Sequence, residues 1–145
     1  MAISVLPVIL LPTMDSDRFE RCTFSLQDRV SLLTVYMTEL PAFVIHFQGL
    51  HWHRCTPYAE CKPGLIMGCD MAVAEVGESP ALKAYLQKSS MAEREARRLR
   101  HFRIYLGKGG CHEAFAQSVY ASGTGTLSRA VSGFLNGIKT RLRRN

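Results

Sequence analysis

The sequence predicts a mainly α protein, a small bundle of four to five helices that follows an extended apolar arm. Three segments carry this prediction, because apolar residues recur at helical spacing over 25–40, 79–106 and 126–145. The chain has 145 residues, of which 47% are hydrophobic, so it is long enough to bury one core. We therefore expect a single domain over 1–145.

The first segment, residues 1–14, is apolar but contains Pro7 and Pro12, which oppose a helix. We expect an extended arm that either packs on the chain's own core or covers a partner surface. The segment lacks the basic start of a secretory signal, so we do not expect one.

The next segment, 25–40, fits a helix that Ser25 caps and that ends near Pro41. Its apolar residues alternate in steps of four and three, which is a heptad-like pattern. Residues 42–54 are ambiguous, because alternating aromatic and aliphatic residues there also fit strands. The alternative fold is therefore α+β, with a short strand pair near 42–54.

Residues 31–50 are also long enough to cross a bilayer, with Glu39 as their only formal charge. Pro41, His46 and Gln48 make the bilayer centre unfavourable for this segment. Membrane contact through 31–50 is thus an alternative that we do not favour over a buried core segment.

The longest predicted helix is basic and spans 79–106. Ser79 suits the N-cap position, Pro80 the first helical position, and Gly107 a C-cap. We expect shorter helices over 65–75 and 111–121. A last basic helix is expected over 126–145, where Gly133 and Gly137 would permit close packing against another helix.

Charge is unevenly distributed along the chain. Residues 1–82 carry five basic and nine acidic side chains, whereas 83–145 carry thirteen basic and three acidic ones. Clustered Lys and Arg favour acidic partners or nucleic acid. The predicted residues that bind an acidic partner or nucleic acid are Arg94, Arg97, Arg98, Arg100, Arg103, Lys108, Lys139, Arg141, Arg143 and Arg144.

A cluster of zinc-binding residue types lies within the acidic half, over residues 51–69. The spacing is looser than in zinc knuckles, so buried cysteines, surface histidines or a disulfide also fit the pattern. Zinc is the one cofactor that these residues suggest. The candidate ligands are His51, His53, Cys55, Cys61 and Cys69.

Cys111 follows a glycine-rich stretch, 107–110, and is a candidate nucleophile. Cys111 would lie in the first turn of the predicted 111–121 helix, where the helix dipole lowers a thiol pKa. A nucleophilic cysteine also needs a base, and the adjacent His112 would point away from it. An inert cysteine is the simpler interpretation.

These observations favour a non-enzymatic accessory or structural subunit. It would dock onto a larger protein or ribonucleoprotein assembly through its basic helical half and its apolar arm. One alternative is a nucleic-acid-binding protein, for RNA or DNA, with a small structural zinc site; another is a cysteine-dependent enzyme. Five cysteines form no recognisable disulfide framework, so we expect an intracellular protein, with the cytoplasm as default and an organelle as the alternative.

Overall fold

The protein is built from two antiparallel β-sheets, which contradicts the predicted helical bundle. The computed structural model describes residues 3–13, 15–27 and 30–123. One sheet has five strands in the order β1-β6-β7-β8-β5, and the other has four in the order β2-β3-β4-β9. The strands are β1 (Ser4–Leu10), β2 (Phe19–Gln27), β3 (Val30–Met37), β4 (Phe43–Gln48), β5 (Trp52–Thr56), β6 (Ala72–Gly77), β7 (Arg100–Tyr105), β8 (Cys111–Ala116) and β9 (Ser118–Gly123).

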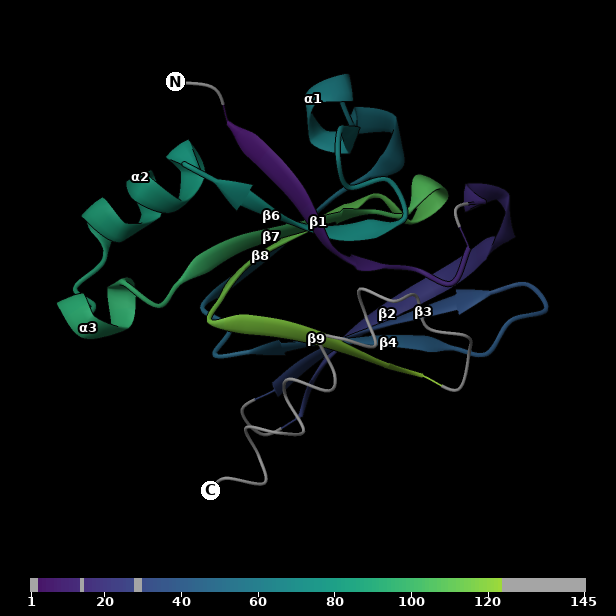
Figure 1. Cartoon of the computed structure of the whole chain (residues 1–145), viewed down its shortest axis with the longest axis horizontal. Helices are drawn as coiled ribbons and strands as arrows, with labels where there is room; N and C mark the ends of the chain where they lie inside the picture. Colours follow the sequence, from purple (N-terminus) through teal and green to yellow (C-terminus); the bar gives the residue numbers. More distant parts are fainter. Residues whose placement is uncertain (1–2, 14, 28–29, 124–145) are drawn as a thin grey trace.

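The two sheets form two layers, and the short helices lie outside them (Figure 1). The helix α1 lies beyond the five-stranded sheet, while α2 and α3 lie at one end of it. The described helices are α1 (Pro63–Ile66), α2 (Pro80–Lys88) and α3 (Glu93–Ala96), with 3₁₀ turns η1 (Ser16–Arg18), η2 (Tyr58–Glu60) and η3 (Gly107–Gly109).

The segment predicted as a helix over 25–40 instead forms β2 and β3. Along β3, burial alternates residue by residue, so Leu33, Val35 and Met37 all face the core. β-Branched and aromatic residues favour such a half-buried strand. The same residues fit helical spacing only because Leu33 and Met37 are also four positions apart.

Residues 31–50 lie mostly in β3 and β4, which pair with each other. Phe43, Ile45 and Phe47 alternate inward along β4 and are at most 2% exposed. Among the described residues, we find no helix with the length and apolar character needed to cross a membrane. The strands near 42–54 do not form the alternative strand pair, because β4 pairs with β3 and β9 while β5 pairs with β8.

The predicted long basic helix over 79–106 is wrong as a single element. Ser79 does cap a helix and Pro80 does begin it, but α2 ends at Lys88. After α3 the chain extends into β7, the central strand of its sheet. Phe102 and Ile104 alternate into the core there, and both are 1% exposed.

The amino-terminal arm is extended, as predicted, but it is a strand of the protein's own sheet. β1 pairs with β6, and Ile9 (0% exposed) and Leu11 (4%) are buried in the core. Pro7 lies where the β1/β6 register shifts, which suits an edge strand because proline has no N–H to donate. Among residues 3–13 of this arm, the exposed large hydrophobic residues are Ile3 and Leu6.

The remaining predicted helices have different outcomes. The 65–75 segment contains the end of α1 and most of β6, and the 111–121 segment forms β8 and part of β9. The predicted helix over 126–145 lies outside the described residues. The "helical" description of the protein is therefore wrong for the part that the structure describes.

The main core lies between the sheets. Residues from both sheets pack there, led by Phe43, Phe102, Leu33, Ile45 and Ile104. A smaller apolar cluster lies on the outer side of the five-stranded sheet, beneath α1. Since successive residues of a strand face opposite ways, Ala114 and Ala116 of β8 belong to the main core while Cys111 belongs to the smaller cluster.

Candidate functional site

A buried chain of polar side chains lies on the outer face of the five-stranded sheet. The Ser79 hydroxyl lies 2.7 Å from His101 Nδ1, and His101 Nε2 lies 3.0 Å from a carboxylate oxygen of Glu113. Ser79, His101 and Glu113 are 5%, 2% and 3% exposed. Three side chains that can titrate or act as a nucleophile are thus joined one after another by hydrogen bonds, and all three are buried.

The local sequence explains where each group lies. β6 ends at Gly77, Glu78 takes a left-handed conformation with φ of 53°, and Ser79 then caps α2 by accepting a hydrogen bond from the Leu82 N–H at 3.1 Å. His101 on β7 and Glu113 on β8 face outward from two adjacent, paired strands. The turn after β6 therefore brings the serine beside His101, near the start of β7.

Glu113 is a buried carboxylate with three charged or polar partners. Burial by itself would raise the pKa of Glu113, but hydrogen bonds from His101 and Arg54 and the charge of Arg103 outweigh it and hold the pKa at about 2. Arg54 donates to Glu113 at 2.8 Å and Arg103 at 3.2 Å. The carboxylate is consequently ionised at neutral pH and acts only as a hydrogen-bond acceptor.

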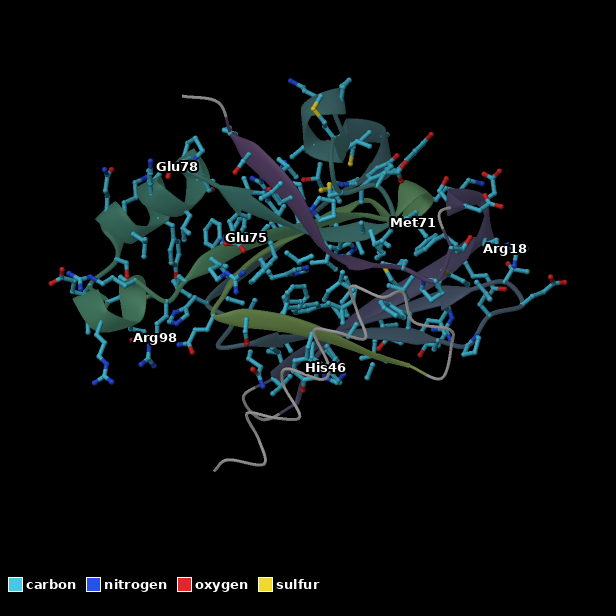
Figure 2. The ribbon with its side chains drawn as sticks, viewed as in Figure 1. Arg18, His46, Met71, Glu75, Glu78 and Arg98 are labelled. Carbon is cyan, nitrogen blue, oxygen red and sulfur yellow. The ribbon has the colours of Figure 1, made fainter. Side chains whose placement is uncertain are left out.

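A hollow of about 210 Å³ adjoins the serine end of this network. Its lining includes Ser79 and His101 together with apolar side chains of Val76, Leu82 and Leu99. Two ion pairs from the same lining, Glu78 with Lys83 and Glu75 with Arg100, are partly exposed. Figure 2 shows Glu75 and Glu78 beside α2, where β6 ends.

A second polar cluster lies on the inner face of the same sheet. His112 Nε2 lies 3.5 Å from Cys22 Sγ and 3.6 Å from Cys55 Sγ, and His112 Nδ1 lies 3.2 Å from His53 Nε2. His112 Nε2 is also 3.1 Å from the Gly109 carbonyl oxygen. The cluster joins β2 of one sheet to β5 and β8 of the other.

Both histidines of the inner cluster favour the neutral form. Burial, and then the neighbouring His112, lower the pKa of His53 to about 4. Burial also lowers the pKa of His112, although a backbone hydrogen bond to Gly109 opposes this effect. His53 is further enclosed by Phe24, whose ring stacks on it with 3.9 Å between centroids.

These pKa shifts predict acid destabilisation. In the unfolded chain a histidine titrates near pH 6.5, so protons favour the unfolded state once the pH falls below that value. Stability should therefore be fully present above about pH 6.5 and decline toward pH 4, where folded His53 takes up its proton. Urea unfolding followed by circular dichroism across pH 7.5–4 measures this decline.

The variant His53→Phe should flatten that decline, because it removes one titrating ring while keeping an aromatic ring that stacks on Phe24. His51→Phe is the matched control, since His51 is outside the cluster and pairs with Glu95 at 3.2 Å. Equal pH slopes for His53→Phe and the unsubstituted chain would contradict the role given to His53.

The structure brings only two of the five predicted zinc ligands together. His53 and Cys55 share the inner cluster, whereas His51 pairs with Glu95. Cys61 Sγ lies 3.4 Å from the Pro57 carbonyl oxygen, and Cys69 Sγ lies 3.0 Å from that of Leu65. Over residues 3–13, 15–27 and 30–123, no group of three or more His, Cys, Asp or Glu residues is placed to hold a metal ion. Zinc binding stays a prediction.

The predicted basic face is divided in the described structure. Arg97 pairs with Glu93 at 2.6 Å, and Arg100 and Arg103 pair with Glu75 and Glu113. Arg98 lies just after α3, at one end of the molecule (Figure 2). Four of the predicted residues, Lys139, Arg141, Arg143 and Arg144, lie outside the described residues.

Counting charges by region changes the interpretation of the basic sequence. The described residues carry twelve basic and eleven acidic side chains, whereas 124–145 carry five basic and no acidic ones. Most of the formal net charge of +6 therefore comes from the carboxy-terminal segment. The two-sheet body is close to neutral.

Cys111 does not have the environment of a reactive thiol. It begins β8 rather than a helix and is 0% exposed. A hydrogen bond with Cys69, and then burial, raise the pKa of the Cys111 thiol. A protonated, enclosed thiol is a poor nucleophile, so the hypothesis of a Cys111 enzyme loses its physical basis.

Sequence reasoning missed the Ser79–His101–Glu113 network. Ser79 was assigned only a capping role, and His101 was placed on a helix. The available signal was the pattern Gly77-Glu78-Ser79-Pro80-Ala81 directly after the apolar run of β6, which suits a strand-to-helix turn that presents a serine. The partners His101 and Glu113 could be found only once the strands were paired.

No known protein family, curated protein or solved structure matches this chain.

Proposed function

We propose that the chain is an accessory or structural subunit that docks onto a larger protein or ribonucleoprotein assembly through its basic carboxy-terminal segment. One observation carries this proposal: 124–145 holds five basic and no acidic side chains, while the described body is nearly neutral. An unbalanced basic segment attracts polyanionic surfaces because association releases their counterions.

The charges of the two-sheet body support a docking role for the carboxy-terminal segment rather than for the body itself. Six of its twelve described cations are held in ion pairs, such as Arg97 with Glu93 and Arg103 with Glu113. The proposal gives the apolar arm no docking role, because Ile9 and Leu11 are buried in the chain's own core. The body is thus a stable carrier for the segment that follows β9.

The test compares two full-length variants with the same change in net charge. The first replaces Lys139, Arg141, Arg143 and Arg144 with Gln. The control replaces four cations of the body that pair with no described carboxylate, again with Gln. Those four are Lys62, Arg94, Arg98 and Lys108.

Binding is measured by fluorescence anisotropy with a 20-residue polyglutamate and with a 20-nucleotide single-stranded RNA, across a salt series. The carboxy-terminal variant should lose at least about tenfold in affinity, and its salt slope on RNA should fall by roughly 0.7 for each phosphate contact removed. The control should lose less than about threefold. A larger loss in the control, or no binding of either probe at low salt, would overturn the proposal.

The nucleic-acid alternative is separated by the same measurement, because RNA binding without polyglutamate binding would favour it over protein docking. An intracellular location is part of the proposal, and the odd number of cysteines supports it.

A further inference from the structure

We propose that Ser79 is an activated nucleophile that takes the acyl group of small esters, with His101 as its base and Glu113 as the group that orients the base. This reactivity goes beyond the docking function and uses a different part of the molecule. It also departs from the sequence-based expectation of a non-enzymatic protein, because that expectation treated Ser79 as a helix cap alone.

The hydrogen-bond partners determine which atom carries each proton of the network. Glu113 is an ionised carboxylate and only accepts, so in the tautomer that can act as a base His101 carries its proton on Nε2, 3.0 Å from Glu113. His101 Nδ1 is then an acceptor, and the Ser79 hydroxyl, 2.7 Å away, donates to it. A hydroxyl that donates to an oriented imidazole is the arrangement that activates a serine.

The base is also held rigidly. The His101 and Phe115 rings form a T-shaped pair, with an interplanar angle of 88° and 5.1 Å between centroids. Arg54 and Arg103 hold the Glu113 carboxylate from two further directions. His101 therefore keeps its orientation toward Ser79 without rearrangement, which is what general-base chemistry needs from its surroundings.

The turn after β6 presents Ser79 beside an open space. Glu78 holds a left-handed backbone, which is uncommon for a residue with a side chain, and the following serine starts α2. Strained residues of this kind are often found at functional sites. The adjoining hollow of about 210 Å³ includes both Ser79 and His101 in its lining.

The hollow indicates the class of substrate. Val76, Leu82 and Leu99 give it an apolar lining, and the charges at Glu78 and Glu75 are matched by Lys83 and Arg100. Its volume is below the range of about 300–1,000 Å³ that holds drug-sized ligands. A short, uncharged acyl group, such as acetyl, fits this chemistry and size.

The reaction balances without any further reagent than water. Ser79 Oγ forms a bond to the ester carbonyl carbon while its proton passes to His101 Nδ1. The bond from that carbon to the alkoxide oxygen breaks, and the proton moves from His101 to the leaving alcohol. Water then attacks the acyl-serine by the reverse proton path, which releases the acid and restores the hydroxyl.

Two features predict that turnover is slow. Pro80 follows the serine and has no N–H, so the backbone donor that follows the nucleophile in many serine hydrolases is absent here. The Leu82 N–H already donates to the Ser79 hydroxyl. Since one such donor contributes about 10²–10³ in rate, covalent labelling is a more sensitive readout than ester turnover.

The experiment treats the full-length protein with a fluorophosphonate probe, in which Ser79 Oγ displaces fluoride from phosphorus and His101 accepts the proton. Intact mass and peptide mapping should show one adduct per chain, on Ser79. Ser79→Ala should abolish it, and His101→Gln should slow labelling by about 10²–10⁴-fold. Hydrolysis of p-nitrophenyl acetate should follow the same order.

Ser89→Ala is the matched control. Ser89 follows α2, and its hydroxyl accepts a hydrogen bond from the Met91 N–H at 3.0 Å, but no hydrogen bond to a histidine is found for it in the described structure. Its labelling rate should equal that of the unsubstituted chain. Circular dichroism and thermal unfolding of each variant show that the fold is retained, and Ser79→Asn keeps a capping side chain at the same place.

Absence of an adduct on Ser79 of the folded, unsubstituted chain would overturn the inference, and so would an unchanged rate in a folded His101→Gln variant. Peptide mapping of the unsubstituted chain does not depend on the stability of any variant. The carboxy-terminal Gln variant should label at the normal rate, so loss of docking and loss of serine reactivity are separate outcomes.

Discussion

Replacing Glu113 with Ala should lower the free energy of unfolding by about 3–5 kcal/mol, a cost typical of breaking a buried charge pair. Glu113 is 3% exposed, and its removal leaves the Arg103 guanidinium, 12% exposed, without the buried carboxylate it contacts. His101, 2% exposed, loses the same partner. Urea unfolding at pH 7 measures the change.

Acid unfolding provides a second readout of the same residue. Because folding lowers the pKa of Glu113 to about 2, its contribution is fully present above about pH 4.5 and is lost as the pH falls toward 2. Glu113→Gln should remove that pH-dependent part. Glu93→Ala is the control, since the Glu93–Arg97 pair is largely exposed and contributes under about 1 kcal/mol. Similar losses at Glu93 and Glu113 would contradict this account.

Phe102→Ala should also cost about 3–5 kcal/mol, because truncating a buried phenylalanine removes apolar contacts and leaves a cavity. Phe102 is 1% exposed on β7, the central strand of the five-stranded sheet, and packs against Phe47 of the opposite sheet with 6.4 Å between ring centroids. It therefore joins the two layers of the core. Chemical denaturation of the purified variant measures the loss.

An exposed apolar residue supplies the comparison for Phe102. Leu26 on β2 is 72% exposed, so Leu26→Ala should change the free energy of unfolding by less than about 0.5 kcal/mol. A loss at Phe102 no larger than that at Leu26 would show that the core between the sheets does not depend on this ring.

The fold class was not recoverable from hydrophobic spacing, because key segments satisfy two periods at once. Phe102 and Leu106 are four residues apart, as in a helix, but Ile104 between them is buried too, as the alternation of an extended chain requires. Pairing with β6 and β8 decides between these patterns, and β6 ends more than twenty residues before β7 begins. Predictions that depend only on neighbouring residues are confirmed, as at the Ser79 cap and the Pro80 start of α2.

The candidate site could not be predicted from local sequence patterns either. Closeness in sequence suggested a group from His51 to Cys69, but only His53 and Cys55 of that group converge, with His112. Ser79, His101 and Glu113 are separated by 22 and 12 positions and meet because β7 and β8 are paired. Such a site depends on which strands are neighbours in the sheet. Composition and residue spacing do not reveal that order.

The strand order has a consequence for biosynthesis. β8 separates β7 from β5 in one sheet, and β9 pairs with β4 in the other, so both layers depend on strands from the end of the described chain. While the ribosome is still translating codons before residue 111, β5 has no neighbour and the edge of β4 that pairs with β9 remains unpaired. The nascent chain must therefore stay unaggregated until late in translation, which makes slow maturation and a need for chaperones the natural expectation.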